Sequence, residues 1–177
     1  MTADKEQELE QVSRRLNTLL AERVNQLEQY QSEFFARLRD ILAGNENVRI
    51  VGDRFLLPSE LLFASASAEL GEAGRRELDK LANLLLDVSA KIPEDVDWIL
   101  RIDGHTDVIP INTPRFPSNW ELSTARAVAV VRYLAAQGVP ERRMAAAGFG
   151  EFFPVAEGTS PEALQRNRRI ELKLTDR

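Results

Sequence analysis

The first forty residues follow a helical pattern of apolar and polar positions. Residues 4–43 contain neither glycine nor proline. Their apolar side chains recur every three or four residues, which predicts a single helical stripe. The stripe consists of Leu9, Val12, Leu16, Leu20, Val24, Leu27, Phe34, Leu38 and Ile41. At about 1.5 Å per residue, such a helix is on the order of 50 Å long.

This stripe has two interpretations. Its spacing is of the heptad type, with one additional gap of four between Leu16 and Val24, which is typical of a coiled coil with a stutter. The alternative is a solvated helix that packs on its own domain. We favour a coiled-coil stalk that dimerises, because the stripe is longer than a small domain can cover. Gly44 is the expected end of the helix.

After residue 44 the pattern changes to short alternating segments. Glycine or proline separates most of them, and Gly52-Asp53 is typical of a hairpin turn. The predicted elements are a hairpin over 48–63, a helix over 68–92, a strand over 96–107, a helix over 119–137, a strand over 143–151, a short helical turn within 157–167 and a strand over 168–175. Strands mixed with helices in this order predict an α+β fold with helices on one face of a sheet. We therefore expect two domains, a helical stalk over 1–44 and a two-layer domain over 45–177.

Composition excludes several classes of protein. The net charge of −5 argues against a broad nucleic-acid surface, which needs an excess of Lys and Arg. Without cysteine, disulfides, Cys-containing zinc sites and thiol nucleophiles are impossible. No apolar run reaches the length of a membrane span, and the acidic first residues do not resemble a signal peptide. We expect either a cytosolic protein or a piece of a longer chain.

The stretch from Asp103 to Ala127 carries the candidate chemistry. Ser118 and Glu121 form a capping box, so a helix should begin there and place Arg126 about two turns in, among small apolar residues. Arg126 must either reach solvent or meet an anion. Asp107 follows the end of a strand, where it is either a turn residue or a binding group. Together the two side chains form a receptor for a zwitterion, with a carboxylate for an ammonium and a planar guanidinium for a carboxylate.

The segments "GHTD" (104–107), "SNWELSTARAVAVVRYL" (118–134), "GFGE" (148–151) and "NRRIEL" (167–172) resemble the OmpA-like peptidoglycan-binding domain. The long loop "TDVIPINTPRFPSNWELS" and the entry segment "VGDRFLLPSELLFASASAEL" resemble its MotB-like, flagellar stator-type subgroup. The resemblance covers roughly residues 48–175. It implies a βαβαβ-type domain in which two helices pack on a mixed sheet.

The resemblance also implies a ligand and its contacts. The family binds diaminopimelate of the peptidoglycan peptide stem, and its motifs place Asp107 on the ammonium and Arg126 on the carboxylate. They imply supporting roles for Thr106, Asn119 and Leu122. Two further residues, Asn167 and Arg168, are expected at the rim of the pocket, although a salt bridge across the sheet is an alternative for Arg168. His105 is expected to be a scaffold residue.

We predict a binding module rather than an enzyme, with no cofactor and no metal. A single histidine without cysteine makes neither a metal site nor a nucleophilic pair. The glycine-rich segments lack the spacing of a nucleotide loop, and Ser123 lies in a helix rather than on a nucleophile elbow. Asp103 and Asp107 could form an acid/base pair, but no second feature of the sequence supports this.

The MotB-like subgroup implies a periplasmic location and a tether to the inner membrane through a segment absent from this chain. It also implies a MotA-like membrane partner, while the apolar stripe predicts a homodimer. The function expected from this resemblance is anchoring of an inner-membrane complex to the cell wall. The alternative is an envelope protein whose OmpA-like domain docks a protein partner instead.

Overall fold

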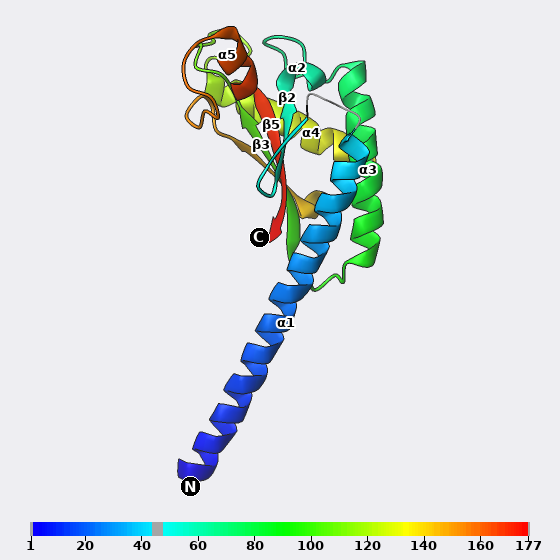
Figure 1. The fold of residues 1–177 in the computed structure, drawn as a ribbon, viewed down its shortest axis with the longest axis vertical. Helices are drawn as coiled ribbons and strands as arrows, with labels where there is room; N and C mark the ends of the chain where they lie inside the picture. The colour runs from blue at the N-terminus through cyan, green and yellow to red at the C-terminus, as the bar shows by residue number, and fades with distance from the viewer. Residues whose placement is uncertain (1, 44–47, 177) are drawn as a thin grey trace.

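The computed structural model describes residues 2–43 and 48–176. A long helix leads into a domain in which helices cover one face of a five-stranded sheet (Figure 1). The elements are α1 (Thr2–Leu42), β1 (Arg49–Val51), β2 (Arg54–Pro58), α2 (Ser59–Leu62), α3 (Glu72–Lys91), β3 (Trp98–His105), α4 (Asn119–Ala136), the 3-10 helix η1 (Glu141–Arg143), β4 (Met144–Gly148), α5 (Pro161–Asn167) and β5 (Arg169–Asp176). Among these described residues, no helix combines the length and apolar content that a membrane crossing requires.

The sheet is mixed, as predicted. Its strand order is β1-β2-β5-β3-β4, and β3 and β4 are the parallel pair while the other neighbours run antiparallel. Alternate residues of β3 and β5 point towards α3 and α4 and form the core between the two layers. These core residues include Leu100, Ile102, Ile170 and Leu172 from the strands, with Leu78, Leu85, Val130 and Leu134 from the helices. The predicted two-layer α+β fold is confirmed.

Two element boundaries predicted from short sequence motifs are confirmed, the turn between β1 and β2 and the start of α4. Val51 pairs with Arg54 across the two-residue turn, in which Gly52 adopts a positive φ of 62°. Ser118 caps α4 by accepting a hydrogen bond from the Trp120 amide at 3.2 Å, and its hydroxyl also donates to Glu121. The capping box predicted from the sequence is therefore present.

The structure corrects the predicted hairpin over 48–63. Its second strand ends at Pro58, and residues 59–62 form the short helix α2 instead of continuing the strand. The backbone of Leu62 packs so closely on α3 that a Cβ at Gly74 would lie 2.7 Å from its carbonyl oxygen. This contact between segments that are distant in sequence has no counterpart in the local pattern.

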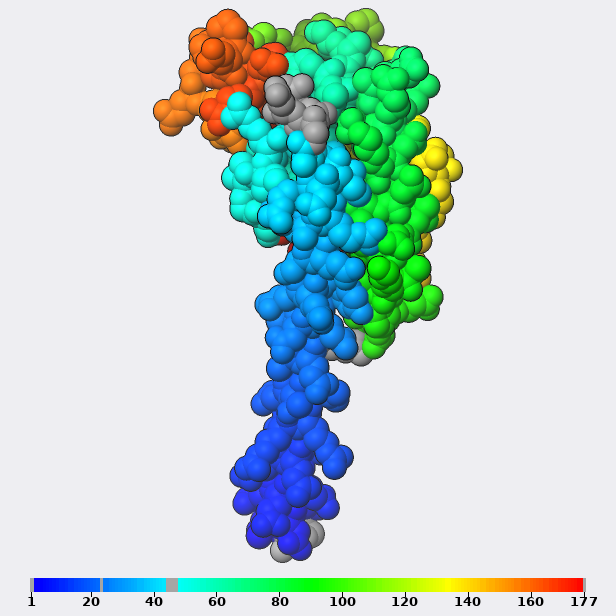
Figure 2. Space-filling view, turned by 45° about the vertical axis from the view of Figure 1, so that its right-hand side comes forward, coloured from blue at the N-terminus to red at the C-terminus, as the bar shows by residue number. Residues whose placement is uncertain are grey.

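The apolar stripe of α1 has two environments. Its first part, the exposed stripe (Leu9, Val12, Leu16, Leu20 and Val24), has side chains that are 53–67% exposed. Farther along, Phe34 and Leu38 are 2% and 0% exposed and belong to the core of the domain. Figure 2 shows the helix leaving the domain on its own and meeting α3 only along its C-terminal part. The C-terminal part of α1 therefore packs on its own domain, which was the alternative interpretation. For the N-terminal part of α1, the coiled coil stays a prediction.

The division into domains at residue 44 also stays a prediction, and Gly44 itself lies outside the described residues. The final turns of α1 are nevertheless attached to the domain by polar contacts. Gln31 Nε2 donates to the Leu174 carbonyl oxygen at 3.1 Å, and Arg37 pairs with Asp87 at 2.6 Å.

Candidate functional site

A cavity of about 510 Å³ opens where β3 ends and α4 begins. Its walls come from α2 and the loop after it, from the loop after β3, from α4, and from α5 with Arg168, which follows it. All six predicted ligand-binding residues line it, namely Thr106, Asp107, Asn119, Leu122, Arg126 and Arg168. The structure thus brings them together, although their contacts with a ligand stay a prediction.

Arg126 is the buried charge of this cavity. Its residue is only 5% exposed, so it is not a surface arginine that reaches into solvent. Nε donates to the Ser67 carbonyl oxygen at 2.8 Å, and Nη2 donates to the Ala64 carbonyl oxygen at 3.2 Å. The guanidinium carbon lies 5.3 Å from the centre of the Phe63 ring. Backbone carbonyls and an aromatic face therefore hold its plane in one orientation.

No carboxylate pairs with Arg126 within residues 2–43 and 48–176, and its Nη1 makes no hydrogen bond there. Burial lowers the pKa of Arg126, and the charge of Arg168 acts in the same direction. Glu60 and Asp107 raise the pKa, but they do not offset burial. A buried guanidinium with an unused donor beside a cavity is well suited to bind an oxyanion.

Asp107 occupies another wall of the same cavity. Its Oδ1 accepts a hydrogen bond from the Ile109 amide at 2.9 Å, which is the turn role considered from the sequence. Its Oδ2 accepts from Arg168 Nη1 at 2.7 Å, so the carboxylate is also a charged wall of the cavity. The turn role is therefore confirmed, and the binding role stays a prediction. Each carboxylate oxygen has two lone pairs, so Asp107 can still accept from an ammonium group.

Arg168 connects the acidic groups of the site. It pairs with Glu60 through Nε and with Asp107 through Nη1. Burial acts to lower the pKa of Arg168, but hydrogen bonds to Asp107 and Glu60 outweigh this effect and leave the pKa above its ordinary value. The ion pairs join the residue between α5 and β5 to α2 and to the loop after β3.

Thr106, Asn119 and Leu122 support the cavity walls and are buried. Thr106 donates through Oγ1 to the Asp107 carbonyl oxygen at 2.9 Å, and Asn119 Nδ2 donates to the Ile109 carbonyl oxygen at 3.0 Å. These bonds fix the backbone on both sides of Asp107.

Sequence reasoning missed Glu60 and Ser59. Both line the cavity, and the buried Ser59 Oγ has no hydrogen-bond partner among the described residues. No local signal marks them, because their position depends on the turn into α2.

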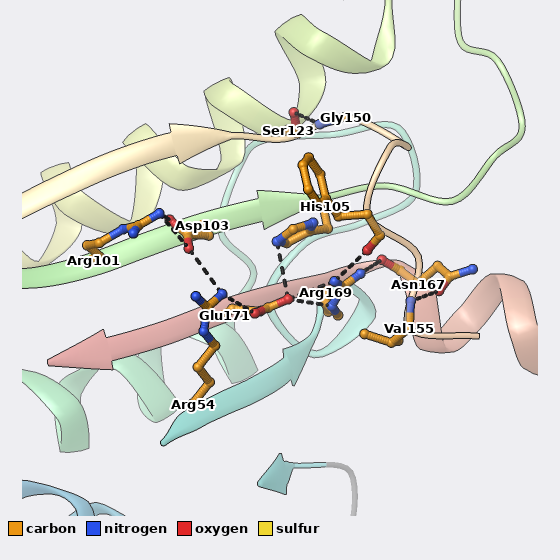
Figure 3. Close-up of polar contacts among 11 residues, drawn as sticks. Arg54, Arg101, Asp103, His105, Ser123, Gly150, Val155, Asn167, Arg169 and Glu171 are labelled. Carbon is orange, nitrogen blue, oxygen red and sulfur yellow. Dashed lines mark hydrogen bonds and ion pairs between the residues drawn. The ribbon is translucent and has the colours of Figure 1, made fainter. Parts of the chain in front are cut away.

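Asn167 and His105 lie outside the cavity walls. Asn167 was expected at the rim, but its side chain instead holds a loop by accepting from the amide of Val155 (Figure 3). It also accepts from the Ala156 amide and donates to the Ala156 carbonyl oxygen. His105 is buried, stacks on Phe149 with ring centres 4.9 Å apart, and lies 3.2 Å from Glu171. Burial lowers its pKa to about 4, so it is neutral near pH 7.

A network of charged side chains on the opposite face of the sheet was not predicted (Figure 3). Glu171 is at its centre and pairs with Arg54 at 3.0 Å and with Arg169 at 2.7 Å. Arg54 also approaches Asp103, at 3.8 Å, and so links it to Glu171, while Arg101 pairs with Asp103 at 3.3 Å. Asp107 lines the cavity described above, whereas Asp103 is 2% exposed and belongs to this network. The described residues also contain no cluster of acidic and histidine side chains that could hold a metal ion.

Known proteins share this sequence and fold. An OmpA family model matches residues 62–168. Motility protein B of Helicobacter pylori (strain J99) is 30% identical over 122 residues, which are 68% of this chain and 45% of that protein. The probable lipoprotein YiaD of Escherichia coli is 33% identical over 143 residues, which are 79% of this chain and 60% of that protein. The chain thus spans about half the length of these relatives.

Two solved structures show the same architecture. A protein described as MotB-like from Desulfovibrio vulgaris has a TM-score of 0.72 at 29% identity, covering 88% of this chain and 99% of its own. The cell wall anchor of the T6SS from Pseudomonas aeruginosa has a TM-score of 0.67 at 33% identity, covering 80% of this chain and 96% of its own. Because the family model matches more than half of the sequence and the fold agrees, the chain belongs to the OmpA family.

Proposed function

We propose that this chain binds peptidoglycan without catalysis, through the diaminopimelate of the peptide stem. The observation that carries the proposal is Arg126, a buried guanidinium that faces a cavity with an unused Nη1 and no carboxylate partner among the described residues. Leaving such a charge unpaired costs several kcal/mol, on the order of what a ligand carboxylate can restore.

Asp107 supplies the complementary charge on the same cavity. The free end of diaminopimelate carries an ammonium and a carboxylate on one carbon. In the proposed complex the ammonium lies on Asp107, the carboxylate on Arg126 Nη1, and Thr106 and Asn119 hold the backbone that positions Asp107. The cavity should prefer a zwitterion, because a ligand with only one of the two charges leaves either Asp107 or Arg126 without a partner.

The known relatives are consistent with an anchoring role. They include a cell wall anchor and a peptidoglycan-associated lipoprotein among the solved structures, and Motility protein B among the curated proteins. We therefore propose a periplasmic domain that fixes an inner-membrane complex of MotB-like type to the cell wall. Its tether would be a segment outside this chain, and its partner in the membrane a MotA-like protein.

Co-sedimentation with isolated peptidoglycan tests this function. We expect Asp107→Ala and Arg126→Ala each to abolish retention, because each removes one of the two charges that hold the zwitterion. Arg142→Ala is the matched control, since Arg142 is exposed and does not line the cavity. Wild-type retention in both cavity variants would refute the assignment.

A second pair of variants separates binding from folding. Arg126→Lys keeps the charge but loses the planar fork, and Asp107→Asn keeps the shape but loses the charge. Both should weaken retention while the circular dichroism spectrum stays native.

A second candidate function is docking of a protein partner. It is favoured by the exposed Trp120 and Phe152, whose ring centres lie 5.0 Å apart beside the cavity-lining Asn119. Exposed aromatic side chains are common at protein interfaces. Co-sedimentation with peptidoglycan distinguishes the two functions. If Asp107→Ala loses retention and Trp120→Ala/Phe152→Ala keeps it, the result favours peptidoglycan binding over docking of a protein partner.

A further inference from the structure

A second hollow, the arginine pocket, lies between the β1–β2 hairpin and α5. Its volume is about 380 Å³, and four arginines line it, namely Arg49, Arg166, Arg168 and Arg169. Glu162 is the acidic residue of its lining. This concentration of guanidinium groups is unusual in a chain whose net charge is −5.

Two of these arginines are already neutralised. Arg169 is buried and pairs with Glu171 at 2.7 Å, while it also donates to the Phe153 carbonyl oxygen at 2.8 Å (Figure 3). Arg168 pairs with Glu60 and Asp107. These contacts hold both side chains in place as part of the pocket wall.

The other two arginines are available to a ligand. Arg49 and Arg166 are exposed, and neither forms a hydrogen bond or an ion pair with any described residue. Arg49 lies on the outermost strand and Arg166 on α5, so two free guanidinium groups line one hollow from two separate elements. Between them, Val51, Leu56 and Val155 provide an apolar surface. The guanidinium groups can bind a carboxylate, and the apolar side chains can contact the carbon chain that carries it. The pocket therefore suits an organic carboxylate better than a bare inorganic ion.

The arginine pocket adjoins the proposed ligand cavity. Arg168 lines both hollows, and Pro58 of the arginine pocket is followed directly by Ser59 of the cavity. We propose that the arginine pocket binds a second carboxylate of the same peptide stem, further along the peptide from the zwitterion that Asp107 and Arg126 hold. The choice of ligand rests on the proposed function, whereas the presence of an anion site rests on Arg49 and Arg166.

Calorimetric titration with two soluble stem peptides tests the proposal. Both peptides end in zwitterionic diaminopimelate, and one carries a further carboxylate that is amidated in the other. We expect the wild type to prefer the carboxylate form by about 2- to 30-fold, the range of two solvent-accessible ion pairs. Arg49→Gln/Arg166→Gln should bind both peptides alike, with the affinity that the wild type shows for the amidated form.

A matched control removes the same charge elsewhere. Arg76 and Arg142 are exposed and lie outside both hollows, so Arg76→Gln/Arg142→Gln should keep the wild-type preference. The proposal is overturned if Arg49→Gln/Arg166→Gln still prefers the carboxylate form, or if the control loses the preference equally.

Failure of the proposed function has a different signature, because then neither peptide binds the wild type. Titration with inorganic phosphate, followed by NMR shifts of the pocket residues, then examines the site alone. If phosphate binds the wild type but not Arg49→Gln/Arg166→Gln, the arginine pocket is an anion site. The proposal that its ligand is a carboxylate of the peptide stem is then overturned. Absence of phosphate binding in the wild type would overturn the site as well.

Discussion

At the residue scale, two glycines set the distance between α4 and the sheet. A Cβ on Gly104 would lie 2.2 Å from the Ser123 carbonyl oxygen, and a Cβ on Gly148 would lie 2.6 Å from the Thr124 amide nitrogen. Both contacts are with the backbone of α4, which cannot move aside alone. The absence of a side chain in β3 and β4 therefore lets the start of α4 bring Arg126 to the cavity.

We predict that Gly104→Ala destabilises the protein by about 1–3 kcal/mol, because the new methyl group pushes α4 away from β3. Thermal unfolding measures this effect. Gly71→Ala is the control, since its Cβ would meet the nearest atom at an ordinary 3.9 Å. Equal melting temperatures for the two variants would contradict the role of Gly104.

The second prediction at the residue scale concerns His105 and the dependence of folding stability on pH. Burial lowers its pKa from 6.5 to about 4, so between these values the unfolded chain binds a proton that the folded chain excludes. The contribution of neutral His105 to the free energy of unfolding is therefore fully present above about pH 6.5. It is lost as the pH drops towards 4, which lowers the free energy of unfolding by up to about 3 kcal/mol.

Urea unfolding at pH 7.5 and at pH 5 tests this, with His105→Asn as the comparison. Asparagine at position 105 does not titrate, so the variant should lose less stability between the two pH values than the wild type. Parallel losses in the two proteins would show that His105 is not the source.

At the element scale, α1 serves two purposes along one continuous helix. Phe34, Leu38 and Leu42 fill the core beside α3, whereas the exposed stripe is neither part of this core nor packed against it. The C-terminal part of α1 is thus a structural helix of the domain.

The same substitution at two positions of α1 should reveal this division. Leu38→Ala should cost about 2–5 kcal/mol because it opens a cavity in the core. Leu16→Ala should stay within about 0.5 kcal/mol, because Leu16 is 54% exposed. Chemical denaturation of dilute protein provides the measurement, and equal costs would refute the assignment of the core.

At the scale of the whole molecule, the exposed stripe is a line of large apolar side chains on a helix that stands away from the domain (Figure 2). We propose that a second copy of the chain covers it, which is the predicted coiled coil. Pairing would also place two binding domains on the same wall and lengthen their attachment.

Sedimentation velocity tests this pairing. The wild type should sediment as a dimer, and Leu16→Glu/Leu20→Glu as a folded monomer with weaker retention on peptidoglycan. A truncation with the same aim must remove only residues 1–26, because Leu27 and several apolar residues after it pack on the domain. A monomeric wild type at micromolar concentration would contradict the proposal.

The sequence by itself determined the features that neighbouring residues encode. Apolar spacing determined the helical and strand segments apart from α2, Gly52-Asp53 the hairpin turn, and Ser118 with Glu121 the start of α4. The motifs from "GHTD" to "NRRIEL" were sufficient to identify the family and six residues that share one cavity.

Only the tertiary structure decided how distant segments complete the site. The carbonyl groups that hold Arg126 come from residues 64 and 67, and Glu60 reaches Arg168 across 108 positions of the chain. The same holds for the end of α1 in the core and for the network around Glu171. Periodicity records which face of an element is apolar, but it does not record which other element covers that face, because that depends on packing between parts of the chain that are far apart in sequence.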